Sequence, residues 1–220
     1  MKIDVLTLFP DMFKVILDNS IIKRAISSNK VSINLVNIRD FSTLSNNQVD
    51  DTPYGGGGGM VLMCEPVFSA IESVRKENSY VVMLTPSGKL YNQSKAYDLS
   101  KHKHIIILCG HYEGFDERIK TLVDEEISIG DFVLTGGEIP AMSIIDSVTR
   151  LVPGVISEES LTSESFTDNL LDYPVYTKPQ VFRGMKVPDV LISGDHKKIE
   201  EYRYSERVRL TKEKRPDLLK

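Results

Sequence analysis

Three stretches of this 220-residue chain place glycine or proline and polar side chains directly after an apolar run. They are Leu84–Gly88 (LTPSG), Leu108–Ile119 (LCGHYEGFDERI) and Ser128–Met142 (SIGDFVLTGGEIPAM). Glycine and proline at such positions let backbone amides and carbonyls face a ligand without side chains in the way. Backbone groups of this kind can bind an adenine edge and a ribose. A tight turn explains any one of these glycines, but three such ends together favour a shared ligand site.

A fourth stretch, DDTPYGGGGGM, contains five consecutive glycines, Gly55–Gly59. A P-loop needs lysine and then serine or threonine after its last glycine, whereas Met60 and Val61 follow here. A dinucleotide fingerprint beginning at Gly55 needs glycine at position 60 and a strand before it, and residues 48–53 are typical of a loop. Both phosphate-binding motifs are therefore excluded, and a flexible linker stays open as an alternative at this point.

The composition is that of a globular protein, with 41% hydrophobic and 26% charged residues. No apolar run approaches the roughly 18 residues of a membrane span, and the N-terminus lacks the pattern of a signal peptide. Cys64 and Cys109 both lie in apolar surroundings, far apart in the chain. This favours two reduced core cysteines of a cytoplasmic protein over a disulfide or a metal site.

The alternation of apolar runs and amphipathic segments predicts an α/β fold with a mostly parallel sheet covered on both faces. We expect strands at 3–8, 31–38, 80–84, 104–108 and 127–134, and helices at 11–17 (capped by Asp11), 20–27, 66–76, 93–100, 116–123 and 140–151. Ligands bind beyond the carboxyl ends of such strands, where the three glycine-bearing stretches lie. We expect three parts: a ligand-binding domain at 1–154, an acidic linker at 155–172 and a small domain at 173–220.

The charge is unevenly distributed along the chain. Residues 178–220 contain 12 Lys or Arg against 7 Asp or Glu, a net +5, which leaves 15 against 24, a net −9, for the other residues. A basic end on an acidic body favours binding to a polyanion, although a solvated helix face explains the charge equally well. A helix is predicted at 196–214 with Asp195 as its cap. Arg203, Arg207 and Lys214 fall within about 40° of one another on it, as a candidate phosphate-contacting edge.

Four motifs, YGGGGGM, CGHYEGFDERI, IGDFVLTGGEIPAM and LLDYPVYTKP, occur in an order that resembles the bacterial tRNA (guanine-N1-)-methyltransferases of the SPOUT superfamily. The resemblance covers essentially the whole chain. It implies a SPOUT-type sheet with a trefoil knot and a small C-terminal helical domain that binds tRNA. It also implies methyl transfer from S-adenosylmethionine to N1 of guanosine 37, beside the anticodon. Such enzymes are homodimers in the cytoplasm, unattached to membranes, with active sites shared between subunits.

Matching the family's motifs residue by residue implies a cofactor shell from the three strand ends, formed by Leu84, Thr85, Pro86, Gly110, Glu113, Ser128, Ile129, Gly130, Asp131, Phe132, Val133, Leu134, Gly136 and Gly137. The glycine loop would lie against the target nucleotide through Gly58 and Gly59, with Gly58 standing where the family commonly has proline. The tRNA contacts are completed by Arg203 and Arg207. Magnesium is compatible with the family's behaviour, but the sequence has no metal-ligand spacing.

Guanine N1 is a poor nucleophile until it loses its proton, so the reaction needs a carboxylate base, and negative charge then develops on O6. The resemblance assigns the cation for O6 to Arg150, which could otherwise serve as a helix C-terminal charge. Glu164 stands where the family has aspartate, and Asp168 is the rival base. An acidic linker without a catalytic role is the alternative for both carboxylates.

Two other functions remain open at this stage. Another SPOUT methyltransferase could modify a base or ribose of ribosomal RNA, although a ribose enzyme needs no carboxylate such as Glu164. A non-catalytic RNA-binding relative would have lost the cofactor. The family usually continues for another helix beyond Arg215–Leu219, so part of the tRNA-contacting surface is expected to be missing or rearranged.

Overall fold

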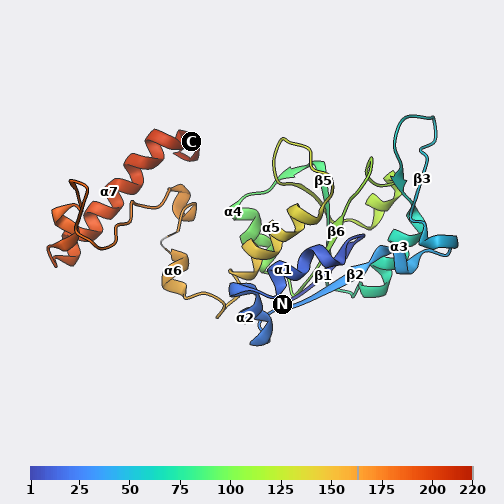
Figure 1. Ribbon diagram of the computed structural model, residues 1–220, viewed down its shortest axis with the longest axis horizontal. Coiled ribbons are helices and arrows are strands. Elements are labelled where there is room, and N and C mark those ends of the chain that lie inside the picture. Colours follow the sequence, from blue (N-terminus) through green and yellow to red (C-terminus); the bar gives the residue numbers. More distant parts are fainter. Residues whose placement is uncertain (163, 220) are drawn as a thin grey trace. The chain divides into compact units, whose positions relative to one another are not determined.

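The computed structural model describes residues 1–162 and 164–219, which form two compact units, Met1–Ile156 and Ser157–Lys220 (Figure 1). The first unit is built on a five-stranded parallel sheet with the order β2-β1-β6-β5-β7. Its strands are β1 (Lys2–Thr7), β2 (Ser32–Asn37), β5 (Ser79–Leu90), β6 (His104–Cys109) and β7 (Glu125–Ser128). The predicted α/β architecture with a mostly parallel sheet is therefore confirmed.

Helices cover both faces of this sheet. One face carries η1 (Pro10–Phe13), α1 (Lys14–Leu17), α2 (Ser20–Ser27), α4 (Gln93–Ser100) and α5 (Glu138–Thr149). The other carries η2 (Ile38–Phe41), α3 (Cys64–Val74) and η4 (Glu117–Leu122). The central strand β6 is buried along its whole length: Ile105 and Ile107 pack toward the first layer, and Ile106 and Leu108 toward the second. A continuous apolar run is what a parallel strand buried on both faces requires.

The strand predicted at 127–134 is too long, because β7 ends at Ser128. The Ser128 hydroxyl donates to the carbonyl of Gly130 (3.0 Å) and accepts from its amide (3.3 Å). These side-chain bonds replace the next ladder positions and turn the chain away from the sheet. Residues 129–137 therefore form a loop instead of a strand.

Strand β5 is longer than predicted, since it continues past the predicted end at Leu84 to Leu90. Ile127 pairs with both Leu84 and Lys89, so residues 85–88 bulge out of the ladder. A Cβ on Gly88 would lie 2.4 Å from the amide nitrogen of Ile127, so only glycine lets the bulge close this tightly. The bulge carries Thr85 and Pro86 outward at the carboxyl edge of the sheet.

Several predicted helix starts are also corrected, including that of α3, which begins at Cys64 instead of residue 66. Helix α5 begins at Glu138, two residues before the predicted start at Pro140. The proline fits in the first turn of the helix, where its missing N–H would have no partner. Asp11 lies inside η1 and pairs with Lys14 (2.7 Å) instead of capping a helix. The segment predicted as helix at 116–123 is the 3-10 helix η4, which Asp116 caps.

The second unit contains α6 (Glu158–Thr162), η5 (Thr167–Asn169), a hairpin of β8 (Val181–Phe182) and β9 (Met185–Lys186), η6 (Asp189–Ile192), α7 (His196–Lys214) and η7 (Pro216–Leu219). Helix α7 has the predicted bounds, and the Asp195 carboxylate caps it by accepting from the amide of Lys198 (3.2 Å). The acidic stretch at 155–172 is not a structureless linker, since it contains α6 and η5. Among the described residues, no helix combines the length and the apolar character that crossing a bilayer requires.

Candidate active site at the carboxyl edge of the sheet

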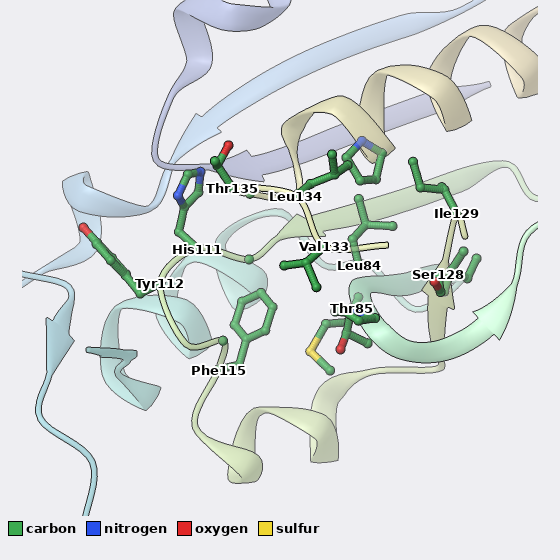
Figure 2. Close-up of a pocket in the computed structure, with 18 of the residues that line it drawn as sticks. Leu84, Thr85, His111, Tyr112, Phe115, Ser128, Ile129, Val133, Leu134 and Thr135 are labelled. Carbon is green, nitrogen blue, oxygen red and sulfur yellow. The ribbon is translucent and has the colours of Figure 1, made fainter. Parts of the chain in front are cut away.

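A cavity of about 410 Å³ opens where β5, β6 and β7 end (Figure 2). This volume falls within the range of about 300–1,000 Å³ that is usual for small-molecule sites. In Figure 2, His111 and Thr135 lie at one end of the cavity and Ser128 and Ile129 at the other. The predicted cofactor residues line it, except for Asp131, which is exposed and does not contribute. The three glycine-bearing stretches therefore meet in one site.

The loop after β7 presents its backbone and apolar side chains to a ligand. No backbone group of residues 131–134 hydrogen-bonds to any other residue that the structure describes. Val133 is 86% exposed, and Phe132 is also exposed, although both line the cavity. Apolar surface beside free amides and carbonyls suits a planar heterocycle with polar edges.

Glycines let this loop lie directly against the end of β6. The amide of Gly137 donates to the carbonyl of Gly110 (2.8 Å). A Cβ on Gly137 would stand 2.7 Å from Cα of Cys109, and one on Gly136 would stand 2.2 Å from Nε2 of His111. Such distances are far shorter than van der Waals contact, so larger residues would separate the two segments. Close backbone approach is the physical reason for the paired glycines.

Sequence reasoning missed a buried carboxylate beneath the cavity. Glu138 is 2% exposed, and its Oε1 accepts from the Thr7 hydroxyl (2.6 Å) while its Oε2 lies 2.8 Å from Nε2 of His111. The His111 ring packs on Phe9, with 4.7 Å between ring centroids. Burial, reinforced by the charge of Glu138, raises the pKa of the Cys109 thiol, which stays protonated. The network ties β1, the β6 end and the start of α5 together under the cavity.

The missed residues His111, Tyr112 and Phe115 lie inside the quoted motif of Leu108–Ile119, and Thr135 and Glu138 lie inside that of Ser128–Met142. The glycines after the apolar runs were the signal in the sequence that marked these segments as candidate ligand-binding segments. It could not show which neighbouring side chains turn toward the cavity.

The glycine loop joins the same site through its last residues. Gly59 has φ +81°, and a Cβ there would lie 2.5 Å from the side chain of Glu113, which lines the cavity. The amide of Glu113 donates to the carbonyl of Met60 (2.9 Å). Both ends of the loop belong to the first unit, where β3 (Asp50–Asp51) pairs with β4 (Val61–Leu62). This excludes a linker between domains, while Gly58 itself is exposed with open space around it.

Comparison with known proteins agrees with this geometry. The family model described as tRNA (Guanine-1)-methyltransferase TrmD matches residues 1–220. The chain belongs to this family. It is 59% identical to the tRNA (guanine-N(1)-)-methyltransferase of Malacoplasma penetrans (strain HF-2), over 99% of this chain and 96% of that protein. Similarity extends to the enzymes of that name from Caldanaerobacter subterraneus (55% identity, 100% of this chain and 92% of the relative) and Staphylococcus aureus (strain JH9; 53%, 100% and 91%).

Arg150, one of the two residues assigned to catalysis by the family resemblance, lies outside the cavity. Arg150 is the half-buried C-cap of α5, whereas the cavity lies at the opposite end of that helix, next to Gly137 and Pro140. Arg150 lies thirteen positions after Gly137 along the helix, a distance of about 20 Å at 1.5 Å per residue. Glu164 belongs to the second unit and is half-buried there.

Asp168, the rival base, is engaged by an arginine of α7. Arg207 donates from Nη1 to Oδ2 of Asp168 (3.2 Å) and from Nε to the carbonyl of Leu171 (3.3 Å), and its side chain is 12% exposed. Arg203 pairs with Glu200 (3.0 Å) and lies over the ring of Tyr173, 4.8 Å from its centroid. Both predicted tRNA-contacting arginines thus hold the segment at 168–173 against α7.

Proposed function

We propose that this chain methylates N1 of a guanosine in tRNA, at position 37 beside the anticodon, with S-adenosylmethionine as the methyl donor. The observation that carries the proposal is the cavity at the carboxyl edge of the sheet, in which three strand ends present backbone groups and apolar side chains. Membership of the tRNA (guanine-1)-methyltransferase family supplies the reaction class. The relatives' names supply tRNA guanine as the substrate.

The cavity residues fit such a cofactor. Residues 131–134 have free amides and carbonyls for the polar edge of an adenine, and Leu84, Val133 and Leu134 supply apolar surface for its faces. When bound, S-adenosylmethionine supplies an electrophilic methyl group on a positively charged sulfur. The side chain of Glu113 lines the cavity and offers a carboxylate for the cofactor's positively charged groups or for a bound cation.

The chain's own contribution to the chemistry is to move a proton and stabilise a charge. In the proposal, the Glu164 carboxylate accepts the N1 proton, which turns the N1 lone pair into a nucleophile. The Arg150 guanidinium stabilises the negative charge that then develops on O6. Asp168 is the rival candidate for the base, and its carboxylate accepts from Nη1 of Arg207 (3.2 Å).

Magnesium would need oxygen ligands beyond those of the protein. Among residues 1–162 and 164–219, no three His, Cys, Asp or Glu side chains are grouped as metal ligands. A magnesium ion in this proposal is therefore shared with substrate or cofactor oxygens.

The position of Arg150 supports the proposal of a homodimer in which each active site combines residues from both subunits. Because Arg150 and the cavity lie at opposite ends of α5, the arginine that serves a given cavity is proposed to come from the partner subunit. Apolar side chains are exposed near this helix: Ile139 on α5, and Met12 and Val15 on the η1–α1 segment that packs beside it. Exposed apolar residues gathered in this way favour a protein interface.

Subunit mixing tests the composite site. Arg150→Ala and Gly136→Val chains are each expected to be inactive, the first without the cation and the second without a functional cavity. Random mixing after denaturation and refolding should restore about a quarter of wild-type activity, because half of the dimers are mixed and each has one intact site. Refolded parents provide the control. Complete inactivity of the mixture would show that cavity and arginine act within one subunit.

We also propose that the first unit is knotted. The chain after β7 passes beyond β5, which lies between β7 and β6, to bond Gly137 to Gly110 at the end of β6. This crossing supports a trefoil knot, although knots are rare exceptions among folds.

The second unit is proposed to bind tRNA, and we propose that the enzyme acts in the cytoplasm because its proposed substrate is tRNA.

Methylation of unmodified tRNA transcripts tests the function directly. Transcripts with guanosine at position 37 are expected to accept one methyl group from labelled S-adenosylmethionine, and nuclease digestion with mass spectrometry should identify 1-methylguanosine. Matched transcripts with adenosine at position 37 should accept none. Methylation of a ribose, of ribosomal RNA or of another tRNA position would contradict the proposal, as would binding of RNA without turnover.

A further inference from the structure

The β8–β9 hairpin of the second unit stands out by its exposure and charge. All residues from 175 to 186 are exposed, and residues 173–188 contain three cations, Lys178, Arg183 and Lys186, without any Asp or Glu. None of the three forms an ion pair with a residue that the structure describes. The hairpin is therefore a positively charged protrusion whose charges are not neutralised within the described part of the unit.

Turn geometry does not explain the arginine at the tip. Val181 pairs with Lys186 and Phe182 with Met185, which leaves Arg183 and Gly184 as a two-residue turn. Both turn residues have positive φ, +48° and +81°, as a type I′ turn requires. Asparagine or glycine suits the first position of that turn, whereas arginine is strained there. The position of Arg183 therefore points to a role for its side chain beyond forming the turn.

The same tip presents an aromatic ring. The guanidinium of Arg183 lies over Phe182, 5.3 Å from the ring centroid, and Phe182 is still 54% exposed. Met185, directly opposite in the hairpin, is 64% exposed. Aromatic rings beside arginine are the platforms on which unstacked bases lie, since every base has an aromatic face.

Helix α7, where the sequence predicted the tRNA contacts, differs from the hairpin in the pairing of its cations. Its arginines all have acidic partners within the unit: Arg203 pairs with Glu200, Arg207 with Asp168, and Arg209 with Glu206 and Glu213. Phosphate binding would have to break these pairs, and Arg207 is largely buried. The exposed cations that α7 retains, such as Lys212 and Lys214, have no exposed aromatic ring beside them in the sequence.

We propose that the hairpin binds a single-stranded part of the tRNA substrate, with a base stacked on Phe182 and phosphates contacted by Lys178, Arg183 and Lys186. This inference rests on the proposed function and identifies which surface of the second unit meets the RNA. RNA is favoured over an acidic protein because the site joins cations to an exposed ring, and stacking uses the ring as well as the charge.

Binding of full-length protein to an unmodified tRNA transcript at several salt concentrations tests the charges. The double variant R183A/K186A is compared with K212A/K214A, which removes two exposed cations from α7. Each lost phosphate contact should reduce the slope of log K against log salt by about 0.7–0.9, so the hairpin variant should lose roughly 1.4–1.8. The α7 variant should keep a slope near that of the wild type. Equal reductions of the slope in both variants would show that the hairpin cations act only through the general charge of the protein, and would overturn the inference.

The ring is tested with a second matched pair. F182A should weaken tRNA binding roughly 5- to 150-fold, the range expected for one stacked base, while F182W restores it. Y204A removes an aromatic residue of α7 that is 61% exposed and should leave the affinity unchanged. Wild-type affinity in F182A would overturn the inference.

Two readouts separate this inference from the proposed function. Calorimetric affinity for S-adenosylmethionine should be the same in all these variants, because the cavity belongs to the first unit. If wild-type enzyme methylates guanosine 37 and the hairpin variants bind tRNA normally, the hairpin inference alone fails. If wild-type enzyme does not methylate tRNA, the proposed function fails. Specific binding of an acidic protein with no hairpin effect on tRNA would likewise contradict the RNA assignment.

Discussion

Replacing Glu164 by glutamine is expected to slow methyl transfer by about 10²–10⁴-fold, the contribution usual for a general base. Glutamine keeps the size and the hydrogen-bonding oxygen of the side chain but cannot accept the N1 proton. Single-turnover measurements with saturating tRNA and S-adenosylmethionine isolate the affected step. Cofactor affinity should be nearly unchanged, because the cavity residues lie in the other unit.

Two further variants make the assignment of the base specific. Glu164→Asp should retain most of the activity, since the carboxylate remains and only its reach changes. Asp168→Asn should cost much less than Glu164→Gln, because an asparagine oxygen can still accept from Arg207 and preserve the contact with α7. A large rate loss in Asp168→Asn together with normal turnover in Glu164→Gln would reverse the assignment of the base.

Replacing Gly136 by valine is expected to abolish measurable binding of S-adenosylmethionine. The new Cβ would lie 2.2 Å from Nε2 of His111 and 2.6 Å from Oε2 of Glu138, so the buried network must move or the loop must shift into the cavity. A shift of the loop displaces residues 131–134, whose free backbone groups are proposed to hold the adenine, and a shift of the network moves His111, which lines the cavity. Isothermal titration calorimetry gives the affinity, and circular dichroism checks that the sheet is retained.

The matched control is Gly58→Ala. A Cβ on Gly58 would have no described atom within 4 Å, and the residue has no positive φ, so alanine should leave cofactor binding unchanged. Val133→Asp provides a second probe of the cavity, since Val133 is exposed and its replacement leaves the core intact. Wild-type affinity in both Gly136→Val and Val133→Asp would remove this cavity from the proposed mechanism.

The sequence alone determined the features that depend on local physics. Apolar runs buried on both faces specified the parallel strands, and Asp195 specified the start of α7, because a cap depends on one side chain and the next turn. Glycines after three strands indicated the site, since close backbone approach needs the absence of a side chain wherever it occurs. Motif order then indicated the family, which the comparisons confirmed.

The tertiary structure decided what depends on residues far apart in the chain. The burial of Glu138 between Thr7 and His111 brings together three elements, and no local pattern in the sequence predicts that contact. The sequence predicted that arginines of α7 contact RNA. In the fold, however, Arg207 pairs with Asp168, 39 residues away. An ion pair depends on which side chains folding brings within reach, whereas the sequence shows only which charges exist. For the same reason, only the fold distinguishes the cations of the β8–β9 hairpin, which have no acidic partner among the described residues, from the paired arginines of α7.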